Sequence, residues 1–118
     1  MKTETKPQRA GTLGPVSVAA LAGVSGTMRV DVQEDSLGTI FVDRGRVWVD
    51  GDVATSADTV AIVDEQADFV RIICGELNPV VAAIQGRILF RGNPELATRI
   101  ILALNAAKPF GAGGAAEA

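Results

Sequence analysis

The sequence is informative first for what it lacks. Its 118 residues include no histidine, no tyrosine and a single cysteine, Cys74. A lone cysteine excludes an internal disulfide and a cluster of cysteine metal ligands. Histidine is the commonest general base and a frequent metal ligand, so its absence removes both of those routes to catalysis. We therefore expect no catalytic residues, no metal ion and no cofactor, and a protein that is not an enzyme.

Basic residues and long apolar runs are also scarce. Lysine occurs only at Lys2, Lys6 and Lys108, and the formal net charge is -3 at pH 7. No cluster of basic residues with interleaved aromatics is present, which argues against a nucleic-acid partner. No stretch approaches the roughly 20 apolar residues of a membrane span, and the first residues make a poor signal peptide. We expect a cytoplasmic protein without stable membrane insertion.

Residues 64–105 carry the clearest secondary-structure signals. Asn78 and Asn93 each precede a proline and then an apolar run. An asparagine side chain accepts a hydrogen bond from an otherwise unpaired helix N–H, and proline at the first helical position has no N–H to lose. The pattern predicts helices that begin at these two residues and an earlier one that begins at Asp64 and ends at Gly75. Residues 87–91 alternate as a strand does.

The first half of the chain has the period of strands. Short turn signals at 35–36, 44–45 and 50–51 separate the alternating segments, and such close spacing favours an antiparallel meander. The fold class predicted is α+β, with a mostly antiparallel five-stranded sheet and helices packed on one face. The domain is expected at 26–107, after a flexible tail with a short helix over 1–25 and before a disordered tail over 108–118. The expected strands are 28–33, 39–43, 46–50, 59–63 and 87–91.

Five features follow one another along the chain: the Gly45–Gly51 hairpin, the strand after Asp58, the acidic helix start at Asp64, the Gly75–Pro79 step and the Gly86–Gly92 strand. Their order and spacing resemble the sterol carrier protein family, the type-2 non-specific lipid-transfer domain. The resemblance covers roughly residues 26–105 and implies a sheet with helices over one face and an apolar tunnel between them. It also implies binding of fatty acids, acyl-CoA, sterols or other lipids without catalytic residues.

Apolar helix faces supply the candidate ligand-binding residues. Ordinary core would show the same periodicity, so the family resemblance, not the spacing, favours a ligand site. Arg71, Arg87, Arg91 and Arg99 either orient a polar head group or belong to a solvated face. The predicted partner is a lipid or another hydrophobic small molecule. The residues predicted to bind it are Phe69, Val70, Ile73, Ile84, Phe90, Ile100, Ile101 and Leu104.

A second interpretation keeps the fold but fills the tunnel. The protein would then be a protein-interaction or dimerisation module, accessory to a lipid-metabolising enzyme. Trp48 would mark either the contact of a homodimer or a second wall of the pocket. Cys74 is interpreted as a small buried hydrophobe, and the acidic residues Asp50, Asp52 and Asp58 as turn residues and not as a cation site.

Overall fold

The computed structural model describes residues 13–51 and 56–110. The described chain forms one six-stranded sheet, one short 3-10 helix and three α-helices. The elements are β1 (Leu13–Ser17), η1 (Ala19–Leu21), β2 (Ser25–Val32), β3 (Asp35–Asp43), β4 (Arg46–Asp50), β5 (Thr59–Val63), α1 (Gln66–Ile73), α2 (Pro79–Ile84), β6 (Ile88–Gly92) and α3 (Pro94–Ala107).

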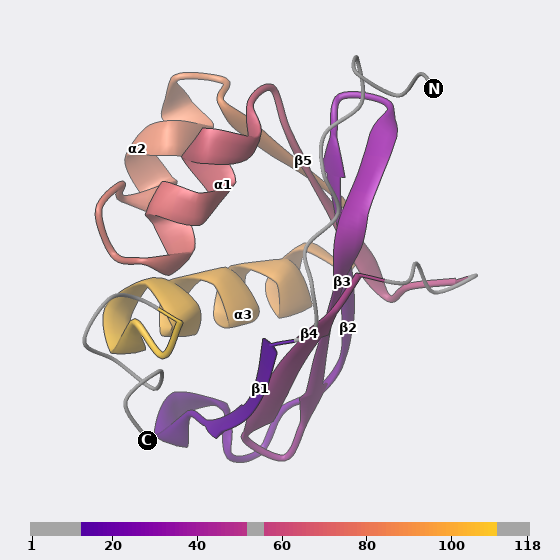
Figure 1. Ribbon diagram of the computed structural model, residues 1–118, viewed down its shortest axis with the longest axis vertical. Helices are drawn as coiled ribbons and strands as arrows, with labels where there is room; N and C mark the ends of the chain where they lie inside the picture. Colours follow the sequence, from indigo (N-terminus) through magenta and orange to yellow (C-terminus); the bar gives the residue numbers. More distant parts are fainter. Residues whose placement is uncertain (1–12, 52–55, 111–118) are drawn as a thin grey trace.

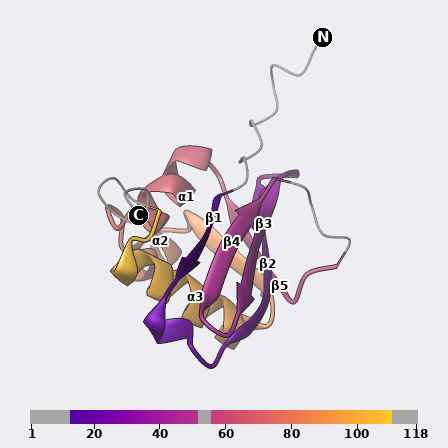
Figure 2. The ribbon, with the colours of Figure 1, turned by 60° about the horizontal axis from the view of Figure 1, so that its bottom comes forward.

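The strands are ordered β1-β4-β3-β2-β5-β6, and all three α-helices lie on one face of the sheet (Figure 1). The second view shows α3 crossing beneath the strands, with α1 and α2 beside it (Figure 2). The predicted α+β class and the placement of the helices are confirmed. None of the helices in the described ranges is both long and apolar enough to cross a membrane.

Residues 13–25 differ from the sequence prediction. A flexible tail with a helix at 16–22 was expected, but β1 adds a sixth strand to the sheet and only one 3-10 turn follows. Val16 pairs with Val47 in antiparallel register, and Val18 and Leu21 are buried. Pairing with the free edge of β4 and burial of these side chains outweigh the weak helical tendency of so short a segment.

The predicted meander is wrong at one step. After β4 the chain returns to the far side of β2, where β5 pairs with β2 in parallel, from Met28 opposite Thr59 to Val32 opposite Val63. Strand spacing could not reveal this because a short connection usually joins antiparallel neighbours. The first turn also lies two residues earlier than expected, at 33–34, because Val32 pairs directly with Asp35.

Asp58 joins three elements where the parallel pair begins. Its Oδ2 atom accepts hydrogen bonds from the Thr27 backbone N–H at 3.0 Å and the Thr27 hydroxyl at 3.4 Å. The Asp58 carbonyl oxygen accepts a third from the Asn93 N–H at 3.1 Å. Gly92 has φ +86°, and a Cβ atom there would lie 2.7 Å from that carbonyl oxygen. Together these contacts fix the start of α3 against β2 and β5.

Both asparagine caps are confirmed. The Oδ1 atom of Asn78 accepts from the Val80 N–H at 2.8 Å, and that of Asn93 accepts from the Leu96 N–H at 3.1 Å. The predicted cap at Asp64 is wrong, because Glu65 occupies the N-cap position of α1 and its side chain makes no capping hydrogen bond. The sequence therefore predicted the start of α1 to within two residues, but it did not identify the N-cap residue.

Replacing Asn93 with alanine tests how strongly the cap holds α3. The Leu96 N–H loses its acceptor, so we expect Asn93→Ala to lower the free energy of unfolding by about 1 kcal/mol. Urea-induced unfolding followed by circular dichroism measures this change. Glu95→Ala in the same exposed first turn is the control, and an equal loss in both variants would contradict a specific role for the cap.

Candidate functional site

The space between the helices and the inner face of the sheet is lined by apolar side chains. Five of the eight predicted ligand-binding residues are buried there and belong to one hydrophobic core that also includes sheet residues such as Val30 and Ala61. From α1 they are Phe69 and Ile73, and from α3 they are Ile100, Ile101 and Leu104.

The other three predicted residues lie differently. Val70 is 43 % exposed and Ile84 is 80 % exposed, while Phe90 is partly buried against the core. The helical lobe, defined here as α1 and α2, turns these two aliphatic side chains to solvent, because Ile72 and Ala82 occupy its inward positions and are fully buried. The candidate set missed Ile72, although its spacing of three from Phe69 puts both on one stripe of α1.

Two polar contacts fasten the helical lobe to the rest of the molecule. The Asn105 side-chain amide donates to the carbonyl oxygens of Ile72 at 2.8 Å and Leu77 at 2.9 Å, which lie at and beyond the end of α1. On the other side, buried Asp68 accepts from Arg87 at 3.2 Å. We call the two Asn105 hydrogen bonds and the Asp68–Arg87 pair the lobe clasps; they bind carbonyl oxygens at the end of α1 and give the buried carboxylate a cationic partner.

Three of the four arginines proposed to meet a head group make ion pairs with carboxylates of the protein. Arg71 lies 3.8 Å from the same Asp68 carboxylate that binds Arg87. Arg99 pairs with Glu95 at 3.7 Å on an exposed face of α3. These contacts match the solvated-face interpretation for three of the four residues. None of the four lies among the buried residues of the apolar layer.

The outer face of the sheet carries a separate group of side chains. Trp48 stacks on Phe41 with ring centroids 5.4 Å apart and an interplanar angle of 7°. Because Val47 and Val49 are buried on the inner face, Trp48 points away from the helices and forms no wall of the apolar layer. Its role in a dimer contact stays a prediction.

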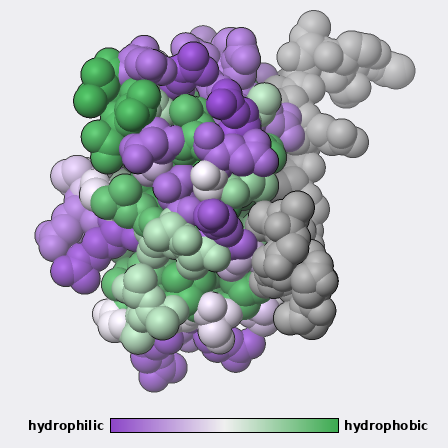
Figure 3. Space-filling view, turned by 90° about the vertical axis from the view of Figure 1, so that its left-hand side faces the viewer, coloured by the Kyte–Doolittle hydropathy of each residue, from purple (hydrophilic) through white to green (hydrophobic). Residues whose placement is uncertain are grey.

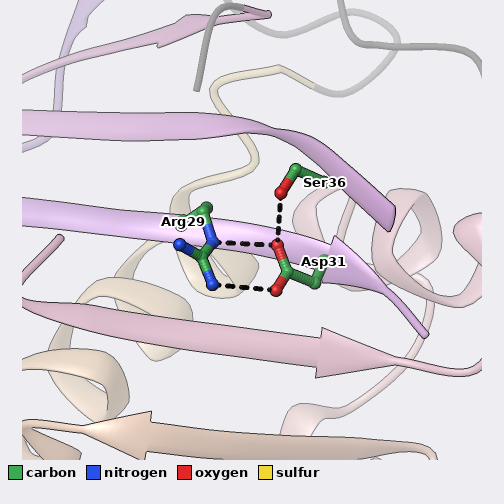
Figure 4. Close-up of polar contacts among 3 residues, drawn as sticks. All are labelled: Arg29, Asp31 and Ser36. Carbon is green, nitrogen blue, oxygen red and sulfur yellow. Dashed lines mark hydrogen bonds and ion pairs between the residues drawn. The ribbon is translucent and has the colours of Figure 1, made fainter. Parts of the chain in front are cut away.

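A polar cluster lies on that outer face as well (Figure 4). Arg29 donates two hydrogen bonds to the Asp31 carboxylate, at 3.0 and 3.1 Å, and the Ser36 hydroxyl donates a third at 3.1 Å. Such a bidentate pair is geometrically well defined and stronger than a neutral hydrogen bond. With three donors on one carboxylate, the cluster is suited to hold β2 and β3 together.

Two surface hollows occur outside the apolar layer. Neither is lined by any of the eight predicted residues. The first has a volume of about 330 Å³ and lies between the start of β2 and the first turns of α3, where Leu96 and Arg99 line it. The second has about 310 Å³ and lies between η1 and the turn joining β3 to β4.

Cys74 and the acidic turn residues are the remaining residues singled out from the sequence. Cys74 is half-buried at the end of α1, which differs from the full burial expected of it. The hydrogen bonds of Asp58 to Thr27 agree with its interpretation as a turn residue. Asp52 falls outside the described residues.

Removing the charge of Asp31 tests the outer-face cluster. We expect Asp31→Asn to lower the free energy of unfolding by about 1–3 kcal/mol, because the Arg29 guanidinium loses a charged acceptor. Urea unfolding measures the loss. Asp43→Asn is the matched control, since its pair with Arg44 is largely exposed and contributes roughly 0–1 kcal/mol. A smaller effect at position 31 than at position 43 would contradict the assignment.

Solved structures share this fold at low sequence identity. UbiJ-SCP2, a ubiquinone synthesis protein, matches with a TM-score of 0.58 and 15% identity over 76% of this chain and 77% of that chain. The inverting sec-alkylsulfatase Pisa1 from Pseudomonas sp. matches with 0.57 and 18% over 77% of this chain and 14% of that one. Palmitated SCP2L2 from Aedes aegypti matches with 0.51 and 21% over 74% and 86%. Comparison with curated protein sequences found no match.

The model of the SCP-2 sterol transfer family matches residues 9–105, most of the chain. Domains of this family typically bind lipids or sterols and are mostly non-catalytic, although some occur within enzymes. The family match confirms the resemblance drawn from the sequence and extends it to include the segment of β1. The chain therefore belongs to the SCP-2 sterol transfer family.

Proposed function

We propose that the protein binds a hydrophobic ligand, a fatty acyl chain or a sterol-like molecule, between the helices and the inner face of the sheet. The observation that carries this proposal is the apolar character of the layer. Its one buried polar side chain in the described part of the sheet's inner face is Thr59, whose hydroxyl already donates to the Arg91 carbonyl oxygen at 2.7 Å. A hydrocarbon placed against this face of the sheet leaves the Thr59 hydroxyl with its hydrogen-bond partner.

Entry of the ligand requires the helical lobe to move away from α3. The lobe consists of helices of eight and six residues, and the lobe clasps hold it at two places. Each methylene transferred from water contributes about 0.8 kcal/mol, so an acyl chain of moderate length can offset the separation of Phe69 and Ile73 from α3. The palmitated state of the Aedes aegypti relative supports an acyl chain as one such ligand.

A matched pair of substitutions on α3 tests the binding site. Ile101 is 2 % exposed and faces the apolar layer, whereas the adjacent Leu102 is 42 % exposed. We expect Ile101→Phe to weaken binding of a dansylated undecanoic acid by about tenfold, because it fills the space the chain would take. Leu102→Phe should bind as the wild type does.

Fluorescence titration measures both affinities, and thermal unfolding checks that each variant is folded. Mass spectrometry of an organic extract from the denatured wild-type protein adds an independent readout. If no lipid co-purifies and the fluorescent fatty acid does not bind, the proposed function fails.

A second candidate function is a protein-interaction module. It is favoured by α2, whose branched aliphatic residues Val80, Val81 and Ile84 all face solvent while its inward residues are Pro79 and Ala82. We call these three residues the α2 ridge. Hydrophobic side chains gather near the top of the helical side, over the helical lobe (Figure 3). The likeness to a ubiquinone synthesis protein supports a role beside an enzyme of lipid metabolism.

Self-association through the α2 ridge distinguishes this second function. If the ridge forms a dimer contact, the wild type sediments as a dimer and Ile84→Ser as a monomer, because the most exposed aliphatic side chain of the helix is lost. Leu89→Ser, at an exposed residue of β6, is the control. A monomeric wild type at high concentration, or a dimer that persists in Ile84→Ser, would exclude this contact.

A further inference from the structure

The hollow between η1 and the β3–β4 turn has a distinctive lining. Among the described residues, the uncharged lining consists of small or apolar residues and the charged lining consists of arginine. The elements that form it, η1 and the β3–β4 turn, lie at the end of the molecule opposite the helical lobe (Figure 1). We call it the arginine hollow, and its lining residues are Ser17, Val18, Ala19, Ala22, Arg44, Gly45 and Arg46.

The charge in the arginine hollow is weakly compensated. Arg46 is exposed, and in the described part of the chain its side chain makes no hydrogen bond or ion pair. Arg44 pairs with Asp43 at 3.2 Å, but the two side chains are 80% and 53% exposed. An exposed pair of this kind contributes little and leaves the guanidinium free to exchange partners. The described lining residues therefore include two arginines and no carboxylate, in a chain of net charge -3.

The backbone that carries the two arginines is held in place. Arg44 and Gly45 have φ values of +50° and +92°, as the two central residues of a type I′ hairpin turn do. The Val18 N–H donates to the Gly45 carbonyl oxygen at 2.8 Å, and the Arg44 N–H donates to that of Val24 at 2.8 Å. A Cβ atom at position 45 would lie 3.2 Å from the Ala22 Cα, so turn and η1 are in close contact. A preorganised turn lowers the entropic cost of binding.

We propose that the arginine hollow binds a phosphate group. Guanidinium groups present paired N–H donors that match phosphate oxygens, and two of them suit a group that carries about -1.5 to -2 charges at neutral pH. The Ser17 hydroxyl adds a donor in the same lining. The volume of about 310 Å³ accommodates the phosphate with a few attached carbon atoms, which would contact Val18, Ala19 and Ala22. The group comes either from a free phosphate ester or from the head of a phospholipid.

Titration of the isotope-labelled protein by nuclear magnetic resonance tests the site. Inorganic phosphate and soluble dihexanoyl phosphatidic acid are added at constant ionic strength. We expect saturable shifts of the backbone amides at 17–19 and 44–46. Binding to Arg44→Gln/Arg46→Gln should be about tenfold weaker, because both guanidinium contacts are lost. Thermal unfolding checks that this double variant is folded. Arg46→Gln alone is the second variant, because it removes one guanidinium group without removing any observed contact.

The double variant Arg91→Gln/Arg99→Gln is the matched control, since it removes the same charge outside the arginine hollow. It should bind phosphate within about twofold of the wild type. Tighter binding of the phosphatidic acid, with added shifts at Ala19 and Ala22, identifies a lipid head group. Equal affinity for both probes identifies a free phosphate. The proposal is overturned if no shift saturates by about 50 mM phosphate, or if both double variants lose binding equally.

Discussion

The hydrogen bonds of Asp58 are the constraint on which the rest of the structure depends. Parallel pairing of β5 with β2 extends the sheet formed by β1 to β4, and β6 then pairs with the other side of β5. The Asp58 carboxylate sets the register by binding Thr27, and its carbonyl oxygen binds the residue that caps α3. One residue thus couples the sheet's only parallel junction in the described chain to the position of its longest helix.

The two sides of the apolar layer are held in place with unequal firmness. On one side, α3 is fixed at its start by Asn93 and along its length by burial against the sheet. On the other side, the helical lobe has short helices, shows much of its aliphatic surface to solvent and relies on the lobe clasps. Regions with fewer buried contacts open at lower free energy. Movement between the helices should therefore occur in the lobe, with α3 and the sheet as the fixed floor.

The sequence predicted those features that local chemistry determines. The asparagine caps, the alternating strands and the apolar stripes of α1 and α3 were each identified from neighbouring residues, and five of eight candidate residues share one core. Long-range choices were missed. Val16 pairs with a strand some thirty positions away in the sequence, and β5 pairs with β2 and not with the preceding strand β4. No local sequence pattern determines either pairing. Val70 and Ile84 are exposed, because Ile72 takes the inward position in α1 and Ala82 that in α2, so their role in ligand binding stays a prediction.

The distribution of arginine decides how a ligand could be recognised. Near the lobe, Arg71 and Arg87 share the buried Asp68 carboxylate, so freeing either one would weaken the contacts that hold α1 in place. A hydrophobic ligand bound in the apolar layer, as proposed above, would therefore be recognised by its shape and by apolar contacts. Neither Arg71 nor Arg87 would be available to bind a charged group on it. Arg44 and Arg46 lie at the other end of the molecule, on a turn with no comparable buried partner. The two proposed sites are separated in space, so a change in one surface need not alter the other.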